Sequence, residues 1–128
     1  MKDSQAYGAA IAWLWAEHAR IMDAEREALE RLEQRDIEGY RQGLRQKAQL
    51  VAGLAGKAEA DLGRFDGLTK EQKTGIILAL EPFSASAETG IALDSPFYMS
   101  ALLYPEDHRP GEPDNLRLCI ERLATENS

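Results

Sequence analysis

Apolar residues recur every three or four positions through the first quarter of the chain, which is the period of one face of an α-helix. Residues 4–34 contain no proline and, after Gly8, no glycine. We therefore predict a single long helix over this stretch. One face of it carries Ile11, Leu14, His18, Met22, Glu25, Leu29 and Leu32.

The width of this apolar face changes along the predicted helix. Before Ala16 apolar residues surround the helix, whereas after Arg20 the other faces carry Glu, Arg and Asp. A helix that is apolar all round is covered on several sides, and one with a narrow stripe packs against a single partner. We expect the N-terminal half of this helix to lie inside a bundle and its C-terminal half to protrude with one companion.

The companion helix is predicted to begin at Asp36, because an aspartate accepts hydrogen bonds from free N–H groups at a helix start. Two long helices joined by so short a turn are antiparallel neighbours, each about 40 Å long. This hairpin covers residues 4–62 approximately. Its second apolar stripe consists of Ile37, Tyr40, Leu44, Ala48, Val51, Leu54, Ala58 and Leu62.

Three shorter helical segments are expected between residues 69 and 125. Thr69 and Gln72 have the spacing of a capping box at the start of the first segment, and Pro82 predicts a kink or a break within it. Ser95 and Pro96 mark the start of a second, short helix. A last helix from about Asp114 to Ala124 would bury Leu116, Cys119, Ile120 and Leu123.

These patterns predict one all-α domain over residues 1–128, a helical bundle built on a long antiparallel hairpin with three shorter C-terminal segments. The length of 128 residues suits a single domain with its own core. Hydrophobic residues make up 44% and charged residues 29% of the chain, as in ordinary globular proteins. No stretch alternates with the period of two that a strand requires.

Charge and cysteine content narrow the possible partners. The net charge of −7 disfavours binding to nucleic acid and to anionic lipid. Glu17, His18 and Arg20 exclude a membrane span in the apolar N-terminal stretch. The single cysteine, Cys119, allows no intrachain disulfide, and we expect the protein in the cytoplasm.

Motifs for catalysis, cofactors and metals are weak. The glycines of residues 53–58 lack the spacing and the hydroxyl residue of a phosphate-binding loop, so no cofactor is predicted. Glu17 and His18 are adjacent and diverge by about 100° on a helix, so they do not form a metal-binding pair. The loop residues Glu106, Asp107 and His108 could bind a cation only weakly, and no metal is predicted. Catalysis is unsupported by the sequence.

One candidate interaction surface lies on the hairpin and comprises Gly39, Tyr40, Gly43 and Leu44. Two glycines four residues apart share one helix face. Each lowers the stability of a helix by about 1 kcal/mol relative to alanine. They would let a partner helix approach closely. Alternatively, they are a pair tolerated in an already long helix or they pack against the first helix, and we favour these two explanations over a partner contact. A distal hairpin of only two helices would leave apolar residues exposed, and a homodimer with Tyr40 and Leu44 near the contact would cover them. The competing explanation is that the C-terminal helix folds back and covers the hairpin within one chain.

Two aromatic clusters offer a different possibility. Trp13 and Trp15 lie on different sides of the first helix near His18, and Phe97 and Tyr98 belong to the short helix. These five residues either complete the core or line a pocket for a ligand or a partner helix.

The stretch from Ala28 to Leu54 resembles the helical hairpin of flagellar and type III export chaperones, in which a long acidic-rich helix turns through a short Asp-containing bend into a second helix. The resemblance covers about a fifth of the chain and does not extend to its proline-rich C-terminal third. It implies a chaperone-like role in binding another protein.

We therefore hypothesise a non-enzymatic helical protein-interaction module, an adaptor or a chaperone, whose partner is another protein or a second copy of itself. The alternative is a small-molecule-binding or catalytic bundle with its pocket near Trp13, Trp15 and His18. The alternative requires inward polar groups, and His18 is one of few candidates.

Overall fold

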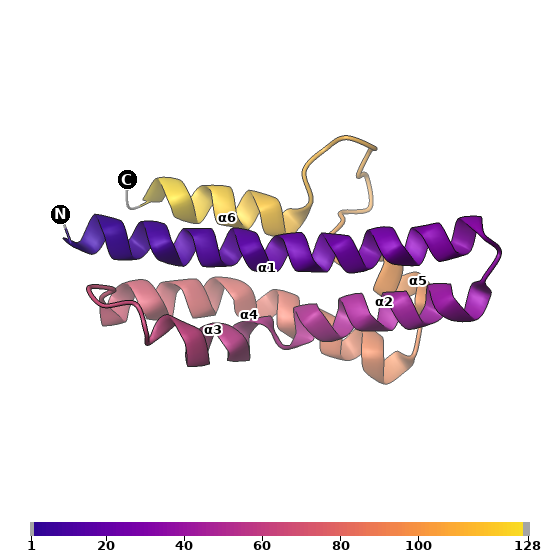
Figure 1. The fold of residues 1–128 in the computed structure, drawn as a ribbon, viewed down its shortest axis with the longest axis horizontal. Coiled ribbons are helices and arrows are strands. Elements are labelled where there is room, and N and C mark those ends of the chain that lie inside the picture. The colour runs from indigo at the N-terminus through magenta and orange to yellow at the C-terminus, as the bar shows by residue number, and fades with distance from the viewer. Residues whose placement is uncertain (1, 127–128) are drawn as a thin grey trace.

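The computed structural model describes residues 2–126, with side chains from Gln5 onward, and all regular secondary structure in this range is helical (Figure 1). The predicted all-α bundle is confirmed. The described residues form six helices: α1 (Lys2–Glu33), α2 (Ile37–Ala52), α3 (Leu54–Leu62), α4 (Lys70–Leu93), α5 (Pro96–Ala101) and α6 (Asn115–Glu126).

The helices are arranged around α1. Figure 1 shows α2 and then α3 returning antiparallel to α1 along one side, with α4 packed against both of them. Helix α6 lies on the other side of the N-terminal half of α1 and packs against it. Short α5 packs against α2 and the end of α4. The hairpin tip, residues 29–35, is exposed. The C-terminal half of α1 as a whole does not protrude with α2 alone, because Tyr104 contacts Met22 and Glu25 there.

The turn at the hairpin tip depends on two adjacent residues. Arg35 adopts the left-handed conformation with φ of 62°, which ends α1. The N–H of Asp36 then donates to the carbonyl of Arg31 at 2.9 Å. The Asp36 side chain accepts from the N–H of Gly39 at 2.9 Å and caps α2, as predicted.

One expectation about helix continuity is corrected, and one open alternative is decided. The predicted second helix is divided at Gly53 into α2 and α3, because glycine weakens a helix interior. Helix α4 runs through Pro82 as one helix, so of the two predicted alternatives, a kink or a break, the break does not occur. Its C-terminal half slopes away from α1 in Figure 1. The capping box of Thr69 and Gln72 and the cap at Ser95 are confirmed.

The predicted stripe of α1 is correct at Ile11 and Leu14, which are buried, but from Glu17 onward the inward face is rotated by one position. Ile21, Ala24 and Ala28 face the core and are almost completely buried, whereas Leu29 and Leu32 are 48% and 40% exposed. Alanine has a small side chain, so α2 can approach α1 more closely along this face than along a leucine face. From Glu17 onward, the pattern of large apolar residues alone therefore pointed to the wrong face.

Helix α4 is long and apolar enough, by length and composition alone, to cross a membrane. Core helices of soluble bundles meet the same criterion, and 28% of the relevant stretch of α4 is buried in this fold. We draw no conclusion about membranes from it.

Candidate functional site

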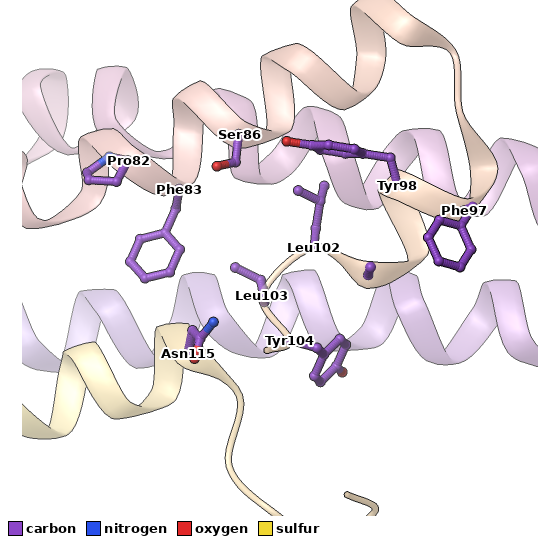
Figure 2. A pocket seen from close by; sticks show the side chains of 10 residues that line it. Pro82, Phe83, Ser86, Phe97, Tyr98, Leu102, Leu103, Tyr104 and Asn115 are labelled. Carbon is purple, nitrogen blue, oxygen red and sulfur yellow. The ribbon is translucent and has the colours of Figure 1, made fainter. Parts of the chain in front are cut away.

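An open apolar groove lies between the C-terminal half of α4, α5 and the start of α6, and we call it the α4–α5 groove (Figure 2). Its volume is about 340 Å³. No charged side chain lines it. Its lining residues are Pro82, Phe83, Ser86, Phe97, Tyr98, Ala101, Leu102, Leu103, Tyr104 and Asn115.

The close packing of α5 on α4 forms one wall of the groove. A Cβ atom at Gly90 would lie 2.9 Å from Cδ1 of Tyr98 and 3.3 Å from Cγ of Met99, so only glycine fits there. The chain leaves α4 at Asp94, which is left-handed with φ of 48°, and the hydroxyl of Ser95 then accepts from the N–H of Tyr98 at 3.1 Å. This turn places Phe97 at the rim, 83% exposed.

The floor of the groove includes a residue with an unusual backbone. Leu103 is buried and has φ of 77°, a left-handed conformation that is costly for a branched side chain. Its carbonyl accepts a 2.7 Å hydrogen bond from the N–H of Asn115, which fixes the start of α6 beside α5. Strained backbone of this kind is frequent at binding and catalytic sites.

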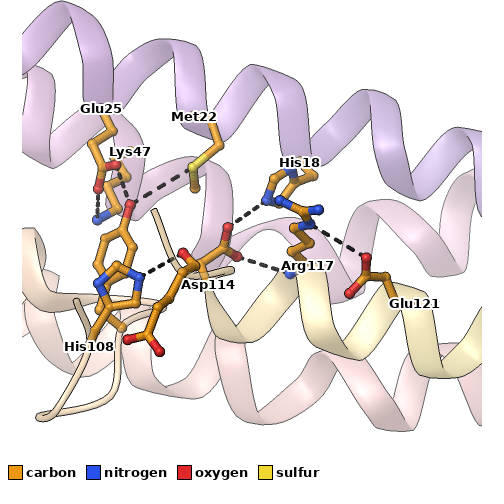
Figure 3. Close-up of polar contacts among 10 residues, drawn as sticks. His18, Met22, Glu25, Lys47, His108, Asp114, Arg117 and Glu121 are labelled. Carbon is orange, nitrogen blue, oxygen red and sulfur yellow. Dashed lines mark hydrogen bonds and ion pairs between the residues drawn. The ribbon is translucent and has the colours of Figure 1, made fainter. Parts of the chain in front are cut away.

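A polar cluster lies next to the groove and is centred on Lys47, a lysine with no exposed surface (Figure 3). Its Nζ donates to Oε1 of Glu25 at 2.8 Å and to the carbonyl of Ser100 at 3.2 Å, and it lies 5.1 Å from the centre of the Tyr104 ring. The Tyr104 hydroxyl donates to Oε2 of Glu25. The cluster therefore joins α1, α2 and the end of α5.

Burial shifts the pKa values of two side chains in this cluster. Desolvation lowers the pKa of Lys47, although the carboxylate of Glu25 opposes the shift. Desolvation also raises the pKa of Tyr104, and the hydrogen bond to Glu25 adds to that increase. Lys47 has no exposed surface, and its ammonium group is held by Glu25, the Ser100 carbonyl and the face of the Tyr104 ring.

His18 connects α1 to the start of α6. Its Nε2 lies 2.8 Å from Oδ2 of Asp114, and its ring meets the edge of Trp15 at a centroid distance of 5.7 Å. Oδ1 of Asp114 accepts from the N–H of Arg117 at 2.9 Å. Burial opposes ionisation of Asp114, but the hydrogen bonds from His18 and Arg117 outweigh it and lower the pKa of this carboxyl group.

The predicted five-residue pocket is not one site. Trp13 donates from Nε1 to Asp61 on α3 at 3.0 Å, and His18 pairs with Asp114. Phe97 and Tyr98 line the α4–α5 groove, to which Trp13, Trp15 and His18 do not contribute. Because α1 and α5 are distant in sequence, helical periodicity could not show how one is rotated relative to the other.

The predicted hairpin surface is largely occupied within the chain. A Cβ atom at Gly43 would lie 2.7 Å from Cβ of Ala28, so this glycine serves the packing of α2 on α1. The space beside Gly39 is taken by the capping side chain of Asp36. Leu44 is 1% exposed and Tyr40 is half-buried. The packing explanation for the glycine pair is confirmed for Gly43.

In the part of the chain that the structure describes, neither a metal site nor a reactive cysteine finds support. Within residues 5–126 no group of three or more His, Cys, Asp or Glu side chains could hold a metal ion, and Glu106, Asp107 and His108 form no such group. Burial raises the pKa of the Cys119 thiol, which makes it a poor nucleophile.

Sequence reasoning missed Lys47 as an interior residue, although a signal was present. Lys47 follows Leu44 by three positions and precedes Val51 by four, so it lies on the apolar face of α2. Pro82 and Leu103 were missed as groove residues, and no periodic signal marks them. The chain matches no protein-family model, no curated protein and no solved structure.

Proposed function

We propose that this protein is a non-enzymatic interaction module that binds an apolar helical segment of another protein in the α4–α5 groove. The observation that carries the proposal is Phe97, which is 83% exposed at the rim of an open, uncharged groove. Exposed aromatic residues beside an apolar hollow are typical of protein-binding sites.

The form of the groove favours a helix as the bound segment. An amphipathic helix binds a groove through apolar residues on one face, spaced three and four positions apart. Such a helix would find contacts on opposite sides, from Pro82 and Phe83 on α4 and from Leu102 beyond α5. The groove has few converging polar groups, which a catalytic site or a polar ligand would need.

A Phe97→Asp variant tests this function. Phe97 makes little contact with the core, so the variant should fold like the wild type by circular dichroism, while a charge at the rim should reduce partner capture by at least about tenfold. Leu118→Asp is the matched control, because Leu118 is 48% exposed on α6 and does not line the groove. Equal capture by both variants would contradict the proposal.

Self-association is the second candidate function, and the hairpin tip favours it. Leu29, Leu32 and Ile37 are 48%, 40% and 52% exposed there. A second copy would meet these three residues, since Leu44 is buried and Ala28 occupies the space beside Gly43. A symmetric dimer would cover one such patch on each copy.

Light scattering at micromolar concentration tests self-association. We expect the mass of a dimer for the wild type and of a monomer for Ile37→Lys, because lysine places a charge at the contact. A monomeric mass for the wild type at every concentration would remove this candidate without affecting the groove.

A further inference from the structure

A second hollow lies below the hairpin tip, between α1, α2 and the loop that follows α5, and we call it the tip pocket. Its apolar walls are Leu29, Tyr40, Leu44 and Pro110, and its polar end carries Glu25, Tyr104 and His108. Its volume is about 380 Å³. Small-molecule pockets commonly occupy about 300–1,000 Å³, so the tip pocket is large enough for a small organic ligand.

The polar end presents hydrogen-bond acceptors. The Glu25 carboxylate accepts one bond at Oε1 from Lys47 and one at Oε2 from Tyr104. A carboxylate has about four acceptor positions, so both oxygens can accept further bonds. Tyr104 has donated its one hydroxyl hydrogen to Glu25, and its oxygen can therefore only accept from a ligand.

His108 adds a third acceptor. Its Nε2 lies 2.9 Å from the backbone carbonyl of Glu112, which can only accept, so Nε2 carries the hydrogen. In the neutral ring Nδ1 is then an acceptor. The remaining hydroxyl at the pocket, on Ser100, donates to the carbonyl of Phe97 at 2.8 Å. Glu25, Tyr104 and His108 thus offer acceptors to a ligand that brings its own N–H donors.

The charges around this end also favour a cation. Glu25 and Asp114 both act on the Tyr104 hydroxyl and help to raise its pKa, after the larger effect of burial. The one ammonium group nearby, that of Lys47, is fully buried and already bonded to Glu25. Glu25 is the carboxylate that lines the tip pocket, and a positive charge placed near it and Tyr104 would be attracted.

We propose that the tip pocket binds a small primary amine with an aromatic body, with its ammonium group at Glu25, Tyr104 and His108. The three N–H bonds of an ammonium group match the three acceptors in number. Its ring would pack between Leu29, Leu44 and the half-buried ring of Tyr40. The tip pocket shares Tyr104 with the α4–α5 groove and Leu29 with the self-association patch, and its other lining residues belong to neither.

The test is calorimetric titration of the full chain at pH 7 with phenethylamine, 2-phenylethanol and butylamine. Phenethylamine should bind at least about tenfold more tightly than the alcohol, because an ammonium group makes charge-assisted hydrogen bonds with the carboxylate. It should also bind more tightly than butylamine, which has the charge of a lysine side chain and no ring.

Two variants locate the binding. Glu25→Gln should weaken phenethylamine binding by about tenfold and leave the alcohol unchanged. His108→Ala should weaken amine binding while it leaves the Glu25–Lys47 pair intact, so it serves if Glu25→Gln fails to fold. The proposal is overturned if phenethylamine shows no saturable binding up to about 10 mM. Equal affinity for amine and alcohol, or for phenethylamine and butylamine, overturns it as well.

Discussion

Gly43 lies where α2 passes closest to Ala28 of α1, and this contact determines how the hairpin packs. A Cβ atom at Gly43 would lie 2.7 Å from Cβ and 2.9 Å from Cα of Ala28. The Cα atom belongs to the backbone of α1, so relief requires the two helices to move apart. The usual gain in helix propensity from glycine to alanine, about 1 kcal/mol, is therefore reversed here.

Gly43→Ala should accordingly lower the free energy of unfolding by about 1–3 kcal/mol in urea titrations. Gly56→Ala is the matched control, because a Cβ atom at Gly56 in α3 has no neighbour within 4 Å. The control should be stabilised by up to about 1 kcal/mol. Stabilisation of both variants would show that α1 and α2 are not in this close contact.

Lys47 shows the limit of reading single residues from a sequence. Its position on the apolar face of α2 was visible, but lysine in a charge-rich helix is ordinarily a surface residue. Its burial depends on Glu25 and the Ser100 carbonyl, which come from α1 and α5. Those partners are 22 and 53 positions away, so they could be identified only once the helices were packed together.

At the scale of the elements, Asp114 attaches α6 to α1. It caps α6 through the N–H of Arg117 and accepts from His18 on α1. Its folded-state pKa lies below the ordinary value of 3.8, so in that range the unfolded chain binds more protons than the folded one. The stabilisation from Asp114 is therefore complete at pH values above the ordinary pKa of 3.8. It is lost as the pH falls through the lower, folded-state pKa.

Asp114→Asn should remove part of this acid sensitivity. Asparagine still caps a helix but carries no charge for His18. We expect the variant to be less stable than the wild type by about 1–2 kcal/mol at pH 7. The difference should shrink as the pH falls below about 4 in urea unfolding followed by circular dichroism. A constant difference between pH 7 and the lowest pH that permits folding would contradict the assignment.

The elements themselves were largely predictable, because their signals are local. Asp36, Thr69 and Ser95 cap the helices that they were predicted to begin. Gly53 was harder to interpret, since a lone glycine can be tolerated within a helix or can divide it. Pro82 was ambiguous for a related reason, because proline can either break a helix or let it continue with a change of direction, and α4 continues.

At the scale of the whole molecule, the α4–α5 groove is formed by segments that start at Pro82 and end at Asn115. Phe97 and Tyr98 were correctly singled out as aromatic residues of one helix, but their pairing with Trp13, Trp15 and His18 was wrong. Periodicity identifies the apolar face of each helix, and it contains no information on which distant helix that face will meet.

Site-specific photo-crosslinking tests the proposed groove most directly. A benzophenone amino acid placed at Phe97, in the full chain expressed in its native host, should crosslink to a discrete partner at an apolar helical segment that mass spectrometry identifies. The same amino acid placed at Leu118 on α6 should not crosslink to that segment. Crosslinking of the same segment at both positions, or no discrete product at Phe97, would contradict the account.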